Sequence, residues 1–152
     1  MPRKKFLFTK EGLENLIKEK QVLEERRIGA VNELTVARDM GDRSENAAYK
    51  YGRQKLSGID RQLRYINSRL QYAIIVEPRT DGKVGIGSKV TISNEKGEKE
   101  YLVVGGDESD VLNGKISQFS PLGRALMGRK VGDTTQLLVP VGKVSYIVLK
   151  VV

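Results

Sequence analysis

The chain has 152 residues and a formal net charge of +8, with 27 basic and 19 acidic side chains. It contains neither cysteine nor histidine, which excludes a disulfide framework, the usual zinc sites, Ser-His-Asp triads and thiol nucleophiles. No apolar run approaches the roughly 20 residues of a membrane-spanning helix, and the apolar start is too short for a signal peptide. We expect a cytoplasmic monomer with no membrane partner. Its charge suits a polyanionic ligand, although basic surfaces also keep proteins soluble.

The first half of the chain carries two heptad patterns. In the first pattern, apolar residues recur at spacings of three and four if Lys20 and Arg27 take the seam positions between them. These apolar residues are Leu13, Leu16, Leu23, Ala30, Leu34 and Ala37. Thr9 is placed to N-cap this helix, and Gly41 to end it at the C′ position. The second pattern follows Leu56, Ile59, Leu63, Ile66, Leu70 and Ala73, with Tyr49 and Gly52 in the same register and Pro78 closing it. The short connection predicts an antiparallel hairpin.

Two carboxylates, Asp42 and Glu45, lie in this connection. Their spacing puts both on one face if a helix begins between or at them. Such oxygen ligands suit Mg²⁺, which often takes its other ligands from phosphate and further carboxylates, so the tip would complete a metal site of a partner. The same spacing is also a capping box, with Asp42 as N-cap and Glu45 reaching back to it. Both interpretations stay open on spacing alone, and they can coexist.

Basic residues form a stripe on the second helix, beside its apolar seam. The stripe contains Lys50, Arg53, Arg61 and Arg64, with Ser57 as a neutral gap. It could follow a phosphate backbone. It could equally be the solvated flank of a coiled coil, because Asp60 interrupts it and such helices are rich in charge outside the seam.

The second half of the chain predicts a small antiparallel sheet. β-Branched runs at residues 89–92, 101–104, 136–139 and 146–149 are separated by glycine-bearing turns. One short helix is expected from Ser120 as N-cap and Pro121 at N1 to Gly128 just past its end. The fold class is therefore α+β, with a coiled coil over residues 1–78, its tip at 41–46, and a globular domain over residues 79–152.

The segments 41–49, 59–65, 116–126 and 130–133 together closely resemble the bacterial transcript cleavage factors GreA and GreB. The tip, Gly-Asp-Arg-Ser-Glu-Asn-Ala-Ala-Tyr, is more similar to GreB. The resemblance implies an antiparallel coiled coil followed by an FKBP-like domain. It also implies that the globular domain docks at the rim of the secondary channel of RNA polymerase while the coiled coil enters the channel.

The resemblance further implies a function in trans. Asp42 and Glu45 would be the catalytic and metal-binding residues, assisting a Mg²⁺ ion held jointly with the polymerase while the polymerase hydrolyses its own backtracked RNA. The free protein is expected to hold no metal and to be no autonomous nuclease. The expected site also includes the tip-supporting residues Gly41, Arg43, Ser44 and Asn46, the basic stripe near the nascent RNA 3′ end, and the docking residues Phe119, Ser120, Pro121 and Leu122. Phe119 departs from the polar residue that usually precedes this Ser-Pro pair, so its docking chemistry stays open.

Three other functions fit parts of the sequence. A regulator that occupies the channel without stimulating cleavage would not need both tip acids. A prolyl isomerase would need an aromatic-lined pocket, whereas the second half offers only Tyr101, Phe119 and Tyr146 and no tryptophan. A structural coiled-coil adaptor would depend on the seam and not on the tip.

Overall fold

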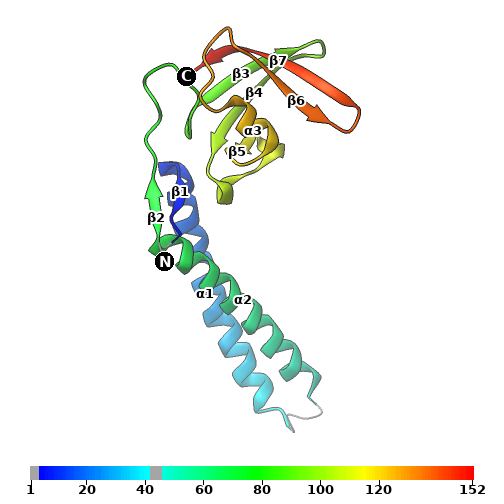
Figure 1. Cartoon of the computed structure of the whole chain (residues 1–152). Helices are drawn as coiled ribbons and strands as arrows, with labels where there is room; N and C mark the ends of the chain where they lie inside the picture. The colour runs from blue at the N-terminus through cyan, green and yellow to red at the C-terminus, as the bar shows by residue number, and fades with distance from the viewer. Residues whose placement is uncertain (1–3, 42–45) are drawn as a thin grey trace. The chain divides into compact units, whose positions relative to one another are not determined.

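The computed structural model describes residues 4–41 and 46–152, and the chain divides into two compact units. Glu14–Tyr72 form one, called here the hairpin unit. Met1–Leu13 and Ala73–Val152 together form the other, called here the sheet unit. Helix α1 (Lys10–Arg38) therefore begins in the segment grouped with the sheet unit and continues through the hairpin unit (Figure 1).

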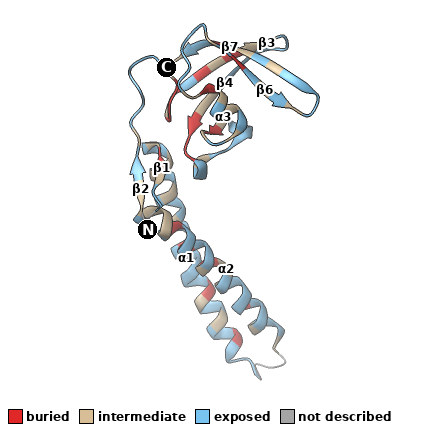
Figure 2. Ribbon diagram, viewed as in Figure 1, coloured by how far each residue is buried: buried red, intermediate tan, exposed pale blue. Residues whose placement is uncertain are grey.

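The hairpin unit consists of α1 packed against α2 (Ala47–Gln71). Figure 2 shows buried positions on both helices. The hydrophobic cluster of this unit contains Leu23, Ala30, Ile59, Leu63 and Ile66, with Leu16, Leu56 and Leu70 partly buried around them. The predicted hairpin and most of its seam are therefore confirmed. Near the tip the packing is tight, because a Cβ on Gly52 would lie 3.2 Å from Leu34 Cδ1.

Two ion pairs join the helices across the edges of this seam. Arg27 Nε donates a hydrogen bond to Asp60 Oδ1 at 2.6 Å, and Lys55 Nζ lies 2.9 Å from Glu33 Oε2. The hydrogen bond and the charge of Asp60 both raise the pKa of the Arg27 guanidinium above its ordinary value. A cation at a predicted seam position is thus accommodated by an acid of the opposite helix, which favours this helix register over its neighbours.

Two expected helix ends are wrong. Helix α1 ends at Arg38 and is followed by a turn, so Gly41, with φ of 145°, lies beyond the C′ position. Helix α2 ends at Gln71 instead of continuing toward Pro78. The next residues form strand β2 (Ala73–Ile75), which pairs in parallel with β1 (Phe6–Phe8). Ala73 matches the heptad, but tertiary pairing with a distant strand overrides this local preference.

A carboxylate of the sheet unit holds the start of α1. Thr9 Oγ1 accepts a hydrogen bond from Gly12 N at 3.0 Å, which confirms Thr9 as the N-cap. Glu108 accepts hydrogen bonds from Thr9 Oγ1 at 2.5 Å, from Thr9 N at 3.1 Å and from Gly105 N at 3.2 Å. Gly105 is required here, because a Cβ on it would lie 1.8 Å from the backbone oxygen of Leu7. A Cβ on Gly12 would lie 1.2 Å from Glu108 Oε1, so a side chain at position 12 would displace the Glu108 carboxylate.

The sheet unit is built on five strands in the order β5-β4-β3-β7-β6. They are β3 (Lys89–Asn94), β4 (Gly97–Val104), β5 (Lys115–Ser117), β6 (Thr134–Val139) and β7 (Gly142–Val151). The four predicted strands are confirmed, and so is helix α3 (Pro121–Leu126) with Ser120 as its N-cap. Strand β5 was not predicted and pairs in parallel with β4, so the sheet is antiparallel except at this edge. Two short 3₁₀ turns, Gly106–Glu108 and Val111–Asn113, make the crossover between β4 and β5.

One face of this sheet forms the core together with α3. Its fully or nearly buried members are Val84, Val90, Ile92, Val103, Ile116, Leu126 and Val148. Tyr101 and Tyr146 pack against this cluster, so two of the three aromatic residues available to a prolyl isomerase pocket serve the core instead. The α+β class is confirmed.

Candidate functional site

The site expected from the sequence centres on the connection between α1 and α2. Asp42, Arg43, Ser44 and Glu45 lie outside the described residues. Among the described residues, no group of three or more His, Cys, Asp or Glu side chains could hold a metal ion. The structure describes the two helix ends on either side of residues 42–45. The roles of Asp42 and Glu45 stay predictions.

Asn46 is the N-cap of α2. Its backbone has φ of −89° and ψ of 99°, and its side-chain Oδ1 accepts a hydrogen bond from Tyr49 N at 3.0 Å. This geometry satisfies one of the free N–H groups of the first helical turn. The capping interpretation placed Asp42 in this role, and for α2 that interpretation is wrong.

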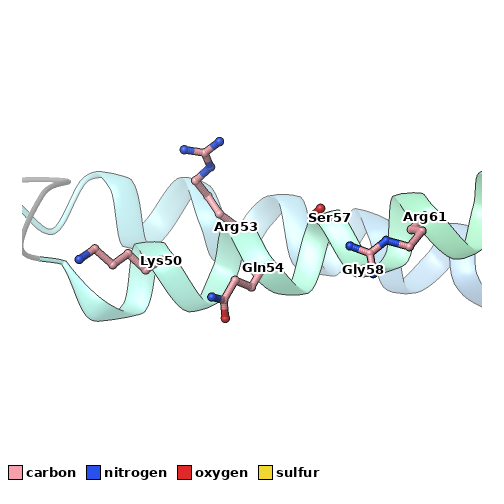
Figure 3. A pocket seen from close by; sticks show the side chains of 6 residues that line it. All are labelled: Lys50, Arg53, Gln54, Ser57, Gly58 and Arg61. Carbon is pink, nitrogen blue, oxygen red and sulfur yellow. The ribbon is translucent and has the colours of Figure 1, made fainter.

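The basic stripe borders a shallow, open groove on the surface of α2 (Figure 3). Its lining residues are Lys50, Arg53, Gln54, Ser57, Gly58 and Arg61. Three of the four predicted cations are thus brought together, whereas Arg64 is not part of the lining. Gln54 and Gly58 were missed by the sequence prediction, which considered charge alone. Helical spacing could have identified them, because Gln54 lies four residues after Lys50 and Gly58 four residues after Gln54, on the same helical face.

The one acid within the stripe is paired, whereas the cations that line the groove are not paired within the described part of the chain. Asp60, which interrupts the stripe in the sequence, is hydrogen-bonded to Arg27 on the other helix. By contrast, Lys50, Arg53 and Arg61 form no ion pair with an acidic side chain in residues 4–41 and 46–152. The groove therefore presents three cations to solvent. Such a row can attract phosphate groups, because each neutralised phosphate releases condensed counterions.

The expected docking segment lies at the start of α3. Ser120 Oγ accepts a hydrogen bond from Gly123 N at 3.0 Å and donates one to Ser117 O at 2.7 Å, while Pro121 is the first helical residue. Leu122 packs against the core cluster. Phe119 is 59% exposed, so its ring belongs to the surface and not to a shifted core. The segment thus combines a capped helix start with one exposed aromatic ring.

No helix in the described part of the chain is long and apolar enough to cross a membrane. The chain forms two units, and the helical hairpin carries two acids in its connection and a cationic groove on α2. A small, mostly antiparallel sheet unit accompanies the hairpin.

Comparison with known proteins assigns both parts of the chain. Residues 6–75 match the family "Transcription elongation factor, N-terminal", and residues 79–152 match "Transcription elongation factor, GreA/GreB, C-term". The chain is 40% identical to transcription elongation factor GreB of Yersinia pestis, over 94% of this chain and 86% of the relative. It is 36% identical to transcription elongation factor GreA of Streptococcus sanguinis, over 99% and 98%.

A solved structure of the transcription factor Gfh1 is also similar, with a TM-score of 0.50, 27% identity and 99% of both chains covered. The chain belongs to the GreA/GreB family of transcription elongation factors. The expectation drawn from the tip and the Ser-Pro segment is confirmed at the level of the family.

Proposed function

We propose that this protein binds bacterial RNA polymerase and stimulates the polymerase to hydrolyse its own backtracked transcript. In this proposal the hairpin enters the secondary channel and presents Asp42 and Glu45 to the active site. The observation that supports it is that the connection of a long helical hairpin contains two acids, Asp42 and Glu45. The N-cap of the second helix is Asn46, so capping of α2 does not account for Asp42. The protein would act as a factor for the polymerase and not as an autonomous nuclease.

The donor set of the tip fits Mg²⁺. Carboxylate oxygens are the ligands this ion prefers, and it commonly binds through one or two carboxylates together with substrate phosphates. When bound, the ion would activate a water and stabilise the developing negative charge. Asp42 and Glu45 would hold it jointly with acids of the polymerase. The role of this chain's own residues is to bring two negative charges to that place and to hold them there.

The cationic groove supports contact with the nascent RNA near its 3′ end. Lys50, Arg53 and Arg61 lie along one side of α2 without acidic partners in the described part of the chain. In this proposal, the phosphates of the displaced RNA strand are the polyanion that the groove would contact. Arg64, further along α2, would contribute only to a longer strand.

Docking would be the task of the sheet unit. The ring of Phe119 is exposed beside the start of α3, where Ser120 and Pro121 fix the backbone. An exposed ring on a rigid support can bury apolar surface on a partner with little loss of conformational freedom. Phe119→Ala is expected to raise the concentration of factor needed for half-maximal cleavage while leaving the rate at saturation unchanged.

The deciding experiment uses a stalled, backtracked polymerase complex with 3′-labelled RNA. Wild-type protein should release a short labelled fragment, whereas Asp42→Asn and Glu45→Gln should lower the rate about 10²-fold or more, as expected when one positioned catalytic group is removed. Both variants should still compete with wild type for polymerase. Added Mg²⁺ should recover part of the rate, since a metal with fewer charged ligands needs a higher concentration to bind.

Asp39→Asn is the matched control, because Asp39 is an exposed acid close to the tip and the substitution removes the same charge. Its cleavage rate should stay within twofold of wild type. Full activity of folded Asp42→Asn at limiting Mg²⁺ would contradict the catalytic assignment. Inhibition of the polymerase by wild-type protein without any fragment release would instead identify a channel-occupying inhibitor.

A separate assay addresses the groove. Neutralising Arg53 and Arg61 to Gln should reduce the salt dependence of cleavage by about one unit in log-log slope for each phosphate that the variant no longer neutralises. Lys18→Gln, an exposed cation of α1 that makes no ion pair with a described residue, is the control. An unchanged slope in the double variant would leave the groove as an ordinary solvated flank.

A further inference from the structure

The inner face of the sheet is longer than the helix that covers it. Helix α3 has six residues and is therefore about 9 Å long. The eight residues of β4 span about 26 Å. Helix α3 packs against β5 and β6, and the turn between β3 and β4 lies away from it (Figure 1). The helix is therefore too short to cover the whole inner face.

The alternation of side chains along β3 and β4 shows which residues continue this face. Val90 and Ile92 belong to the core, and Asn94 is the next residue on the same side of β3. On β4, Lys99 lies opposite Ile92 and Gly97 lies opposite Asn94. The inner face therefore changes from apolar to polar side chains at the end that carries the turn.

A pocket with a volume of about 190 Å³ lies at this polar end. Its polar side is formed by Asn94, Lys96, Lys99 and Tyr146, and its apolar side by Ile92 and Val144. Ile92 is buried, so the apolar side continues into the core. Sites for drug-sized ligands enclose roughly 300–1,000 Å³. This pocket is smaller, so it fits one ring system of a ligand and not a large ligand as a whole.

Each polar side chain of the pocket offers a hydrogen-bond donor. Lys96 Nζ, Lys99 Nζ and the Tyr146 hydroxyl have no hydrogen-bond or ion-pair partner within residues 4–41 and 46–152. Asn94 Oδ1 accepts a hydrogen bond from Lys96 N at 2.9 Å, which leaves the NH₂ group of Asn94 as a donor. None of the described residues that line the pocket is acidic. Charged donors without an acidic partner favour an anionic ligand.

The kind of cation indicates a phosphate as the anion. Arginine is favoured where a planar carboxylate is bound through two parallel hydrogen bonds, whereas lysine binds phosphate as a point charge. The pocket contains two lysines and, among its described lining residues, no arginine. A phosphate monoester carries close to two negative charges at neutral pH, which two ammonium groups balance.

The apolar side of the pocket indicates that the ligand also carries a ring. Tyr146 is half-buried, packs against the core cluster and lines the pocket as well. Together with Val144 and Ile92 it offers an aromatic and aliphatic wall, on which a planar ring can bury apolar surface. Phosphate and planar ring occur together in a nucleotide.

We propose that this pocket binds a nucleotide, with the base against Tyr146 and Val144 and the phosphates on Lys96 and Lys99. A neighbouring hollow shares Asn94, Lys96 and Val144 with the pocket and adds Lys143 as a third cation. Phosphates that extend from the pocket would lie there.

The inference does not depend on the proposed function, because all lining residues of the pocket and the hollow belong to the sheet unit. Glu95 also lines the hollow, so its charge limits how many phosphates the hollow can take. A nucleoside diphosphate is therefore the probe of choice.

The test is a titration of the full-length, ¹⁵N-labelled protein with ADP at physiological ionic strength, at which weak attraction to exposed charges is screened. Backbone amide shifts report the place of binding and the dissociation constant. Pyrophosphate and adenosine are titrated in parallel, because each supplies only one part of the nucleotide. We expect saturable shifts at Lys96, Gly97, Val144 and Tyr146, and tighter binding of ADP than of pyrophosphate or adenosine.

Two variants and one control assign the binding to the pocket. Lys96→Gln combined with Lys99→Gln should weaken ADP binding about tenfold or more, since both charged donors are lost. Tyr146→Phe keeps the ring and removes the hydroxyl, so it should weaken binding by about threefold to tenfold. Lys89→Gln removes an exposed cation at the other end of β3 and should stay within twofold of wild type.

Four results would overturn the inference. One is the absence of saturable shifts with ADP, and another is equal affinity for ADP and pyrophosphate, which would identify a simple anion site. A third is an unchanged ADP affinity in the double lysine variant. The fourth is a set of shifts confined to Lys50, Arg53 and Arg61, which would place the ligand in the groove on α2. The cleavage assay of the proposed function has no bearing on any of these outcomes.

Discussion

Replacing Glu108 with alanine should destabilise the sheet unit more than the loss of an ordinary surface carboxylate would. The side chain accepts three hydrogen bonds, two from Thr9 and one from Gly105. A hydrogen bond to a charged acceptor contributes about 1.5–3 kcal/mol, and a buried donor left without a partner costs about as much. Because Glu108 is partly exposed, water would replace some of these hydrogen bonds. We therefore expect a loss of about 2–3 kcal/mol for Glu108→Ala and about 1 kcal/mol for Glu108→Gln, which keeps an acceptor oxygen.

Calorimetry and amide hydrogen exchange would measure this effect. For a unit of 60–100 residues each kcal/mol corresponds to about 4–8 °C in melting temperature, so Glu108→Ala should lower the melting of the sheet unit by about 10 °C or more. The amides of Thr9 and Gly105 should lose protection first. Glu98→Ala, an exposed glutamate of β4, should change stability by less than about 0.5 kcal/mol. Unchanged melting of Glu108→Ala, with both amides still protected, would refute the reasoning.

Three smaller predictions test packing and charge. Gly123→Ala should lower the free energy of unfolding by about 1–3 kcal/mol in thermal melts, because the new Cβ would lie 2.0 Å from the backbone oxygen of Ser117. Gly29→Ala should instead stabilise α1 by about 0.5–1 kcal/mol, because no atom lies within 4 Å of its new Cβ. Leu63→Ala should destabilise the hairpin by about 2–5 kcal/mol in urea unfolding followed by circular dichroism, and a loss below about 1 kcal/mol would contradict its place in the seam. The hydrogen bond from Arg79 lowers the pKa of Asp81 from its ordinary 3.8 to about 2. The contribution of this carboxylate to stability is therefore present above pH 3.8 and is lost as the pH falls toward 2. An NMR titration midpoint near 3.8 would contradict this prediction.

The helices and four of the strands were predictable because their signals are local. A heptad pattern sustained over a long segment specifies a helix and its buried face together, and the match between the predicted seam and the buried residues of α2 follows from that. Alternating β-branched runs between glycine turns did the same for β3, β4, β6 and β7. The N-caps Thr9 and Ser120 were found because a cap depends on only a few consecutive residues.

The missing elements depend on partners far away in the sequence. Strands β1, β2 and β5 have three residues each, too few for an alternating pattern, and Phe6 pairs with Ala73. The role of Glu108 was also hidden, because its partner Thr9 is 99 positions away. In the hairpin, the sequence indicated a cap near the tip but selected Asp42, since the Asp-x-x-Glu spacing is a stronger local pattern than a lone Asn46. In the structure α2 begins at Ala47, so Asn46 is its N-cap.

The sheet unit is discontinuous in sequence, and this has a consequence for synthesis on the ribosome. Its first segment, Met1–Leu13, is made before the hairpin, but β2 and Glu108 with which it pairs follow the hairpin. The hairpin unit, which is continuous in sequence, can fold as soon as α2 has emerged, whereas the long-range pairs must wait. Residues synthesised before the hairpin are thus among the last to find their partners. A truncated protein that starts at residue 79 would lack that segment, and Glu108 would be left without Thr9 permanently.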